Sequence, residues 1–476
     1  MKSGAFFAAG VAFALLLSSA ARAQVEITTE SLSLHFGAQG ELLAAEACHP
    51  RCADPDARRQ AISAPGGIVS FADAETTQWS WVRGLETRES VLSFRSSDGR
   101  EVTWSIPESG YGVGLTVQGA GALMLRSGDS LKPRALPGFG GWLEQVRHVV
   151  IERDGAEAFG PGELDTETVR AEWAGVRSRF WSVLVSADRS SRFRLGVDAD
   201  GGPTVLRGGK SEREELLLYI GPVEPRALAA TDPLLRHMMY AGLWFWLRWI
   251  CFALFYLLDA IHALVPVWGV AIVVLSFSVN FLMAPLSRAA DRVQQTVHET
   301  EARLAPELTR IKQEFRGEEQ AAKIIALYKT ERVHPLYSLK SLVGVAIVIP
   351  VFIGAFDMLA EKFHLMHTPF LWISDLSRPD AFAALPMDLP FFGSSLNLLP
   401  FVMTALSIVA SVMHRPLAQH ALVRRRQVRN MIVLAAVFFV LFYTFPAGMV
   451  LYWTTNNLIS VLKALWARFR PVTESH

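Results

Sequence analysis

Uncharged, apolar stretches dominate the second half of the chain. They occupy Ala263–Ser287, Ser341–Phe356, Leu389–Met413 and Asn430–Leu462. All except Ser341–Phe356 exceed the length of about 20 residues that an α-helix needs to cross a bilayer. The last run has 33 uncharged residues with Pro446-Ala447-Gly448 in its middle. It is too long for one span and predicts two short helices joined by a turn. The pattern therefore predicts an all-α core of five membrane spans within residues 266–476.

A tryptophan-rich segment, Tyr240–Val265, precedes the first span and is interrupted by Arg248, Asp259 and His262. Tryptophan side chains with interspersed charge prefer the level of the lipid headgroups. We therefore expect an interfacial helix within residues 231–265.

The charged stretch between the first two spans, residues 288–335, has helical periodicity. Apolar residues fall on one face at steps of three, four or seven, at Val293, Val297, Leu304, Leu308, Ile311 and Phe315. Gly317 ends this helix, and Ala321–Arg332 is expected to return as a second one. The stretch therefore predicts a helical hairpin.

The distribution of Lys and Arg gives the orientation. Residues 288–335 carry nine, residues 414–429 carry five without an acidic residue, and Lys362–Pro390 carries two. Basic loops remain in the cytoplasm. The hairpin is therefore expected in the cytoplasm, and the Lys362–Pro390 loop on the outside.

The first half of the chain has short alternating segments separated by Gly, Pro, Asp and Ser. The segments are Val25–Phe36, Ile68–Phe71, Gln78–Val82, Val91–Phe94, Val102–Ile106, Gly112–Val117, Val149–Glu152, Phe180–Val185, Phe193–Val197 and Glu215–Ile220. Such spacing predicts an all-β sandwich over residues 24–230. Alternation favours a core position, rather than a ligand platform, for the tryptophans of this half, which include Trp79, Trp81, Trp104 and Trp142.

The N-terminus resembles a secretory signal. Lys2 precedes the uncharged run Ser3–Ala21, and Ala21-Arg22-Ala23 has small residues where a signal peptidase requires them. We expect cleavage after Ala23, which makes residues 1–23 a cleavable signal peptide and the sandwich an exported domain. An uncleaved N-terminal anchor is the alternative.

Composition excludes some classes of function. The chain has 46 Lys and Arg against 45 Asp and Glu, so bulk charge gives no case for nucleic-acid binding. We find no paired carboxylates at a motif spacing, no nucleophile elbow and no glycine-rich phosphate loop, which argues against an enzyme. Cys48 and Cys52 in an exported domain favour a disulfide; free thiols or a metal site are the alternatives.

Four ordered blocks in the second half resemble the YidC/Oxa/Alb group of membrane protein insertases. They are Leu304–Leu308, Ala326–Leu336, Pro369–Ser377 and Phe445–Leu458. The front domain resembles the bacterial periplasmic sandwich of this family more weakly, through Trp173–Trp181 and Tyr219–Pro222. The resemblance implies five helices around a water-filled groove, into which a hydrophobic segment of a nascent membrane protein slides before it enters the lipid.

The resemblance further implies a non-enzymatic insertase and membrane chaperone that needs neither ATP nor a metal or other cofactor. It would lie in the bacterial inner membrane with its large domain in the periplasm, and its partners would be nascent membrane proteins, received from the ribosome or the Sec translocon, and membrane lipid. The short tail after Trp466 leaves Arg424–Arg426 and the hairpin as the expected ribosome contacts.

Candidate groove residues follow from spacing and from the resemblance. Ser276 and Asn280 are four apart and share a helix face, as do Thr404 and Ser407, three apart. The resemblance adds Tyr452 and Trp453 as client contacts. Asn280 stands where the family has a groove arginine, and we hypothesise that Lys340, at the start of the next span, supplies the positive charge instead. The alternative is that Lys340 is an ordinary basic residue at the cytoplasmic boundary of the membrane.

Two departures from the family keep other functions open. They are Asn280 and the Tyr337–Ser341 entry to the second span. The second hypothesis is a specialised or inactive paralogue. It would act mainly as a membrane-anchored periplasmic binding module for a carbohydrate or an envelope protein. A small-solute transporter is disfavoured, because neither an inverted repeat nor a charged pair at mid-membrane is visible.

Overall fold

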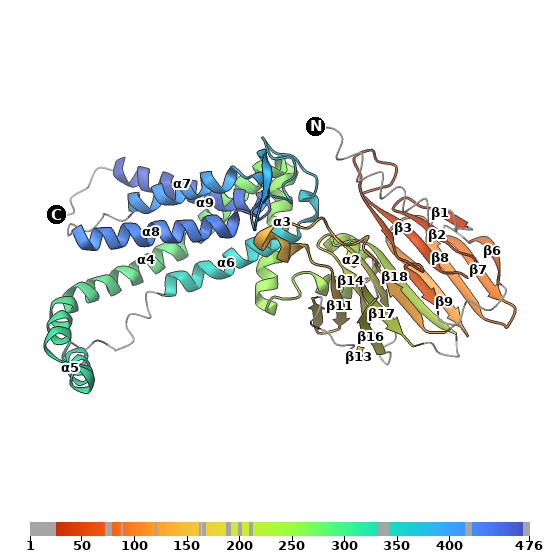
Figure 1. The fold of residues 1–476 in the computed structure, drawn as a ribbon, viewed down its shortest axis with the longest axis horizontal. Coiled ribbons are helices and arrows are strands. Elements are labelled where there is room, and N and C mark those ends of the chain that lie inside the picture. Colours follow the sequence, from red (N-terminus) through yellow and green to blue (C-terminus); the bar gives the residue numbers. More distant parts are fainter. Residues whose placement is uncertain are drawn as a thin grey trace. The chain divides into compact units, whose positions relative to one another are not determined.

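The chain forms two compact units. The computed structural model describes residues 25–71, 79–86, 89–119, 121–160, 163, 168–186, 192–198, 202–208, 213–331, 333, 342–414 and 421–469. The sandwich unit comprises the chain up to Trp244, Ala360–Leu398 and Val440–Ala447, and the helical unit comprises Phe245–Leu359, Leu399–Phe439 and the chain from Gly448 onward. The predicted order, a β-sandwich followed by helices, is confirmed (Figure 1). The signal peptide predicted for residues 1–23 lies outside the described residues.

Two antiparallel sheets build the sandwich unit. The first has the order β1 (Val25–Thr28), β2 (Leu32–Phe36), β3 (Leu42–His49), β5 (Val69–Phe71), β10 (Leu123–Arg126), β17 (Pro203–Arg207), β16 (Arg192–Val197) and β13 (Thr168–Arg170), with β4 (Arg58–Ser63) paired to β3. The second has the order β12 (Gly155–Phe159), β11 (Arg147–Glu152), β14 (Trp173–Arg177), β15 (Trp181–Ser186), β18 (Glu214–Pro222), β9 (Gly112–Gln118), β8 (Glu101–Pro107), β7 (Glu89–Ser96) and β6 (Trp79–Glu86).

Aromatic side chains from both sheets fill the space between them. Phe36 of β2 lies 5.2 Å from Trp104 of β8 between ring centroids, and both side chains are fully buried. The indole Nε1 of Trp104 donates to the carbonyl oxygen of Gly40 at 2.9 Å, so its polar atom is satisfied. Trp104 therefore occupies the core as predicted. Trp142 does not: it lies in the 3₁₀ helix η2 (Gly138–Glu144) and is 58% exposed. The side chains of Trp79 and Trp81 lie outside the described residues.

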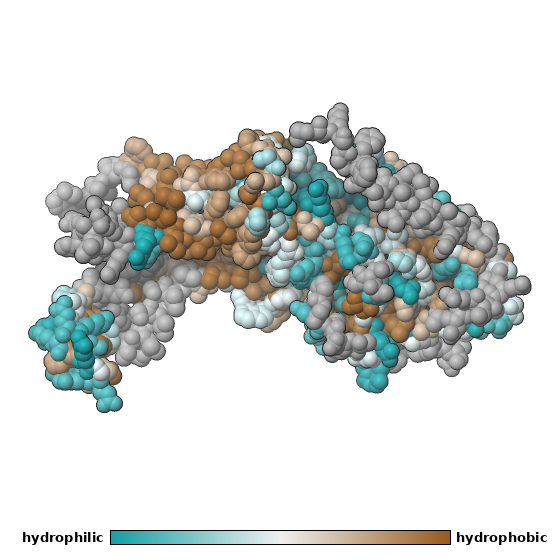
Figure 2. All heavy atoms as spheres, in the orientation of Figure 1, coloured by the Kyte–Doolittle hydropathy of each residue, from teal (hydrophilic) through white to brown (hydrophobic). Residues whose placement is uncertain are grey.

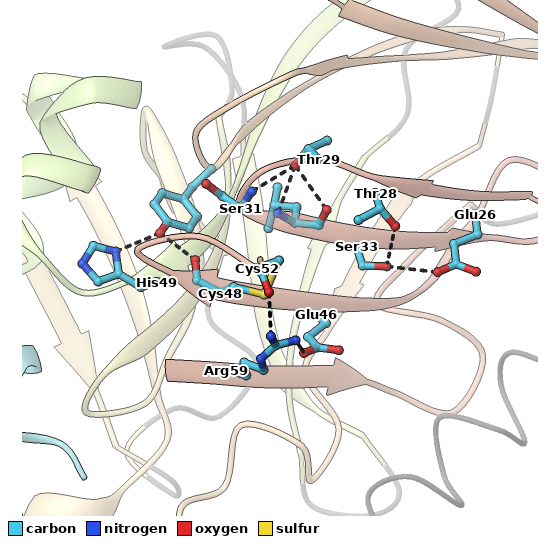
Figure 3. The surroundings of a disulfide bond; sticks show 12 residues. Glu26, Thr28, Thr29, Ser31, Ser33, Glu46, Cys48, His49, Cys52 and Arg59 are labelled. Carbon is cyan, nitrogen blue, oxygen red and sulfur yellow. Dashed lines mark hydrogen bonds and ion pairs between the residues drawn. A yellow bond between two sulfur atoms is a disulfide. The ribbon is translucent and has the colours of Figure 1, made fainter. Parts of the chain in front are cut away.

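The Sγ atoms of Cys48 and Cys52 are bonded to each other in the structure (Figure 3). The surrounding backbone is held independently of this bond. The hydroxyl of Tyr111 donates to the carbonyl oxygen of Cys48 at 2.8 Å, and Arg59 Nη2 donates to that of Cys52 at 2.6 Å. The loop between the cysteines is short, so the bond removes little entropy from the unfolded chain.

His49, next to this disulfide, is a candidate source of pH dependence in the sandwich unit. Its Nδ1 lies 2.8 Å from the Tyr111 hydroxyl, and Phe363 packs edge-on against its ring at 5.1 Å. Burial, and secondarily the charge of Arg58, lowers the pKa of His49 to about 4.

We predict that the sandwich unit loses stability as the pH falls from about 6.5, the ordinary histidine pKa, towards the folded pKa of about 4. In this window the unfolded chain binds a proton that the folded chain does not. Thermal unfolding at a series of pH values checks this, and His49→Gln should flatten the curve there. A parallel loss of stability in parent and variant would exclude His49 as the cause.

Further segments complete the sandwich unit. After β18 come α2 (Pro225–Thr231), which is capped by the Glu224 carboxylate, and η3 (Pro233–Met238), which is capped by Asp232. The connection between α6 and α7 contributes η5 (Phe363–Leu365) and a hairpin of β19 (Ala383–Leu389) and β20 (Gly393–Leu396). These segments supply several of the contacts described below.

The helical unit is made of long helices. They are α3 (Phe245–Leu264), α4 (Trp268–Glu314), α5 (Gly317–Thr330), α6 (Leu342–Glu361), α7 (Leu399–His414), α8 (Ala421–Phe442) and α9 (Ala447–Phe469). The run at Asn430–Leu462 is divided at Pro446, as predicted. The helix on its C-terminal side, α9, begins at Ala447.

The described helices include two that are long and apolar enough to cross a membrane, Phe245–Leu264 and Trp268–Ala290. Shorter apolar helices occupy Leu399–Met413 and Val428–Phe442. The five-span core and the interfacial position of α3 therefore stay predictions. Figure 2 shows a broad hydrophobic surface over the helices, and exposed side chains such as Ile432, Leu434 and Val437 contribute to it, each more than half exposed.

The helix α4 joins the first predicted span to the first helix of the predicted hairpin. A single helix of 47 residues runs from the apolar stretch into the charged one and contains Pro285 and Pro306. The residues after Leu286 are mostly good helix formers, so nothing in them ends the helix. Val297, Leu304 and Ile311 of the predicted stripe are buried, and Gly317, at φ +63°, begins the return helix α5. That helix starts four residues before the predicted Ala321, because Glu318 and Glu319 favour a helix N-terminus.

Candidate functional site

A polar cluster lies between α4 and α9 in the helical unit. We define it as Ser276 and Asn280 of α4 with Tyr452, Asn456 and Lys463 of α9. Asn280 Nδ2 donates to Asn456 Oδ1 at 2.6 Å and to the backbone oxygen of Ser276 at 3.0 Å. Lys463 Nζ donates to Asn280 Oδ1 at 3.0 Å. The Asn280 amide is therefore used on both its nitrogen and its oxygen.

Helical spacing explains why these residues meet. Ser276 and Asn280 are one helical turn apart on α4, and Tyr452, Asn456 and Lys463 follow at steps of four and seven on α9. The fully buried Ser276 hydroxyl lies 3.1 Å from the carbonyl oxygen of Ile272 and 3.3 Å from that of Tyr452. Two polar helix faces therefore lie against each other.

The cluster lies well inside the apolar part of α4. Asn280 precedes Arg288, the first charged residue after it, by eight residues, which is about 12 Å of helix. The two residues that follow Asn280 are apolar and exposed: Phe281 is 81% exposed and Leu282 64%. The side chain of Lys463 is exposed. If α4 and α9 cross the membrane as predicted, a cation at this position needs a partner or water. The Lys463 ammonium carries three N–H donors, and its recorded contact within the described part of the chain uses one of them.

The other predicted groove residues are placed differently. Thr404 Oγ1 donates to the carbonyl oxygen of Pro400 at 2.8 Å, a bond within its own helix α7, and Ser407 is half-buried. Trp453 packs against Phe352 of α6 at 4.7 Å and stacks on Phe438 of α8 at 5.7 Å between ring centroids. Lys340 lies outside the described residues. The structure thus brings Ser276, Asn280 and Tyr452 together, without Thr404, Ser407 or Trp453.

The sequence interpretation missed three residues of α9. Asn456 and Lys463 belong to the cluster, and Asn457 Nδ2 donates to the carbonyl oxygen of Met403 in α7 at 3.1 Å. The adjacent pair Asn456-Asn457 in a long uncharged run could have indicated contacts with other helices, because membrane helices rarely carry amides without a hydrogen-bond partner. The sequence pattern alone gives no groove role to Lys463.

An arginine cluster, Arg58, Arg177 and Arg179, is the second polar arrangement, and it lies in the sandwich unit. Each of the three binds the C-terminal end of α6 or the segment that follows it. Arg58 donates to the carbonyl oxygens of His364 at 2.9 Å and Met366 at 2.8 Å, and Arg177 Nη2 donates to Glu361 Oε1 at 3.0 Å.

Arg179 is the most deeply buried member of this cluster, with its side chain 3% exposed. It pairs with Glu144 Oε1 at 3.0 Å and donates to the carbonyl oxygen of Ser377 at 2.8 Å and to that of Ala360. Burial lowers the pKa of Arg179, and the charges of Glu144 and Asp375 oppose this change. The side chain therefore links the turn between β14 and β15 to η2, to the end of α6 and to the connection that follows α6, through a paired, buried charge.

No metal centre is formed within the ranges that the structure describes. No group of three or more His, Cys, Asp or Glu side chains there is arranged to hold an ion. The candidate sites are therefore built from amides, hydroxyls, one lysine and the arginines.

This chain is similar to members of one family of bacterial membrane proteins. Residues 260–472 match the family model described as "60Kd inner membrane protein". The membrane protein insertase YidC of Syntrophobacter fumaroxidans is 30% identical over 267 residues, which cover 56% of this chain and 45% of that protein. That of Cellvibrio japonicus is 34% identical over 262 residues, covering 54% and 42%. The aligned part thus spans less than half the length of these relatives.

A solved structure was also matched, "Active YidC insertase crystal structure with the first transmembrane domain resolved". The alignment covers 98% of this chain and 99% of that one, with a TM-score of 0.37 and 17% sequence identity.

Proposed function

We propose that this chain, which belongs to the YidC family of membrane protein insertases, inserts hydrophobic segments of nascent membrane proteins into the bacterial inner membrane. The observation that carries the proposal is the polar cluster of Asn280, Asn456 and Lys463 within apolar helices. Amides and a cation inside a membrane span are costly, and a protein that is only anchored in the membrane does not need them there.

The polar cluster lowers the cost of moving a polar segment into the membrane. Burying an amide without a hydrogen-bond partner costs several kcal/mol in a hydrocarbon environment. Donors and acceptors on α4 and α9 shorten the apolar path that the translocated tail of a client protein must cross. The apolar segment of the client then gains about 25 cal/mol per Å² of buried surface, so insertion needs no chemical step and no ATP.

Lys463 is the described candidate for the positive charge that the family has as a groove arginine. Its ammonium reaches the Asn280 amide, which stands at that arginine's position. We therefore assign the role hypothesised for Lys340 to Lys463, with Asn280 holding the ammonium in place. An acidic tail of a client would be the favoured partner for this cation.

The remaining parts follow the predicted orientation. The sandwich unit would be periplasmic and the α4–α5 hairpin cytoplasmic, where the hairpin would receive clients from the ribosome or the Sec translocon. The alternative of a membrane-anchored binding module is not favoured, because the similarity to relatives named as insertases includes the helical half.

Depletion rescue tests the proposed function. The full chain, expressed in a bacterium whose own insertase is depleted, should restore growth and the insertion of a client measured by protease protection. Asn280→Leu combined with Lys463→Leu should abolish rescue at an equal level of protein in the membrane. No rescue by the parent, despite correct membrane localisation, would refute insertase activity in favour of the binding module.

A further inference from the structure

A cavity in the sandwich unit has more arginine than acidic side chains in its lining. Its volume is about 160 Å³, and its charged lining residues are Arg59, Arg134, Arg179, Arg378, Glu144 and Asp375. One wall comes from the strands and the loops next to them, and the other from the connection between α6 and α7. This volume admits several water molecules, since about 10 to 15 Å³ of probe-occupied space is enough for one. It suits a small polar group rather than a large ligand.

The acidic residues of the lining are already engaged within the protein. Glu144 accepts from Arg179 Nη1, and Asp375 Oδ1 accepts from the backbone nitrogen and the hydroxyl of Ser377 at 2.8 and 2.7 Å. Arg378 Nη2 lies 3.4 Å from the carbonyl oxygen of Arg134, which brings the segments of two further arginines together. Arg59 is paired with Glu46 at 3.3 Å, so the other three arginines of the lining face two carboxylates. The remaining positive charge favours an anion.

One atom marks the place that an acceptor would take. Arg179 Nη2 is buried and has no hydrogen-bond partner, although the other two nitrogens of this guanidinium are bonded. Leaving a buried donor unsatisfied costs about 1 to 3 kcal/mol, and more for a charged group. A guanidinium with one unbonded nitrogen, here Nη2 of Arg179, and further arginines close to it are typical of sites that bind oxyanions.

The segments that line the cavity also carry exposed apolar side chains. Trp142 of η2 is 58% exposed, and Leu371 and Trp372 of the α6–α7 connection are 75% and 39% exposed. Exposed aromatic residues favour the depth of the lipid headgroups. In the sequence the connection lies directly between two apolar helices, α6 and α7, which favours a membrane lipid as the source of the anion.

We propose that this cavity binds a phosphate group, and that a phospholipid headgroup supplies it. The phosphate oxygens would accept from the free edge of Arg179 and from Arg134 and Arg378. Free inorganic phosphate has the same chemistry and is the other source. This site does not depend on insertase activity, because all its residues belong to the sandwich unit.

Native mass spectrometry of the delipidated full chain tests the proposal, with phosphatidylglycerol, diacylglycerol of the same acyl chains, and inorganic phosphate as separate probes. Arg134 is exposed and Arg378 half-buried, so Arg134→Gln with Arg378→Gln leaves the buried Arg179 and its pairing intact. Arg192→Gln with Arg194→Gln on β16 is the matched control, because it removes the same charge from exposed positions.

The parent should bind one phosphatidylglycerol that the Arg134→Gln, Arg378→Gln protein binds on the order of tenfold more weakly, since two charge-assisted hydrogen bonds are lost. The control should bind like the parent, and diacylglycerol should not distinguish the three proteins. Competition by inorganic phosphate confirms the phosphate site, and binding of inorganic phosphate without any selective lipid binding refutes the lipid as its source. Equal lipid binding by parent, variant and control, without selective binding of inorganic phosphate, means that the cavity holds water only and overturns the proposal.

Discussion

Replacing Lys463 by leucine should reduce the insertion of a client with an acidic translocated tail by about tenfold or more. A hydrogen bond to a charged group is worth about 1.5 to 3 kcal/mol, and the replacement removes the cation that reaches Asn280 at 3.0 Å. Lys463→Arg should retain most of the activity. A client with an uncharged tail should be affected much less, because it gains little from the cation. Protease protection of the translocated tail in proteoliposomes measures each case.

Two further variants separate the charge of Lys463 from its packing. Asn280→Arg in the Lys463→Leu background returns a cation to the cluster and should restore insertion of the acidic tail. Lys132→Leu makes the same chemical change at a half-exposed lysine of the sandwich unit, which pairs with Asp129, and should leave insertion unchanged. If Lys463→Leu inserts the acidic tail as well as the parent does, Lys463 is not the groove cation.

The strands that could be predicted are those with clear alternation. β8 alternates between partly and fully buried positions along its whole length, and the sequence shows the same period. β3 and β4 were missed because one is rich in alanine and the other begins Arg58-Arg59-Gln60. These strands are fixed by pairing with neighbours rather than by a pattern of their own.

The polar cluster shows a similar limit for the helical unit. Asn280 could be singled out, because an amide in a membrane span needs a partner. Its partners could not be assigned, since Asn456 and Lys463 lie more than 170 residues away in sequence. Likewise, Arg179 contacts Ser377, 198 residues later, and Arg58 contacts His364, 306 residues later. Periodicity reveals which face of an element is polar, but not which element lies against it.

Replacing Arg179 by methionine should destabilise the sandwich unit by about 3 to 5 kcal/mol, because removal of one partner leaves the other as an uncompensated buried charge. The pair is buried on both sides, with Arg179 3% and Glu144 5% exposed in their side chains. The variant also loses donors to the carbonyl oxygens of Ala360 and Ser377. The unfolding temperature should fall on the order of 10 °C for a unit of this size.

Two comparisons distinguish the buried charge from ordinary loss of side-chain volume. Arg95→Met breaks the exposed pair with Glu101, in which the arginine side chain is 72% exposed, and should cost at most about 1 kcal/mol. Combining Arg179→Met with Glu144→Leu removes both charges, so the double variant should be more stable than Arg179→Met alone, although the lost carbonyl contacts keep it below the parent. Thermal unfolding of the purified full chain, together with hydrogen exchange of β14 and β15, measures these differences. Equal losses in the single and double variants would show that the pairing of Arg179 with Glu144 does not account for the stability of this unit.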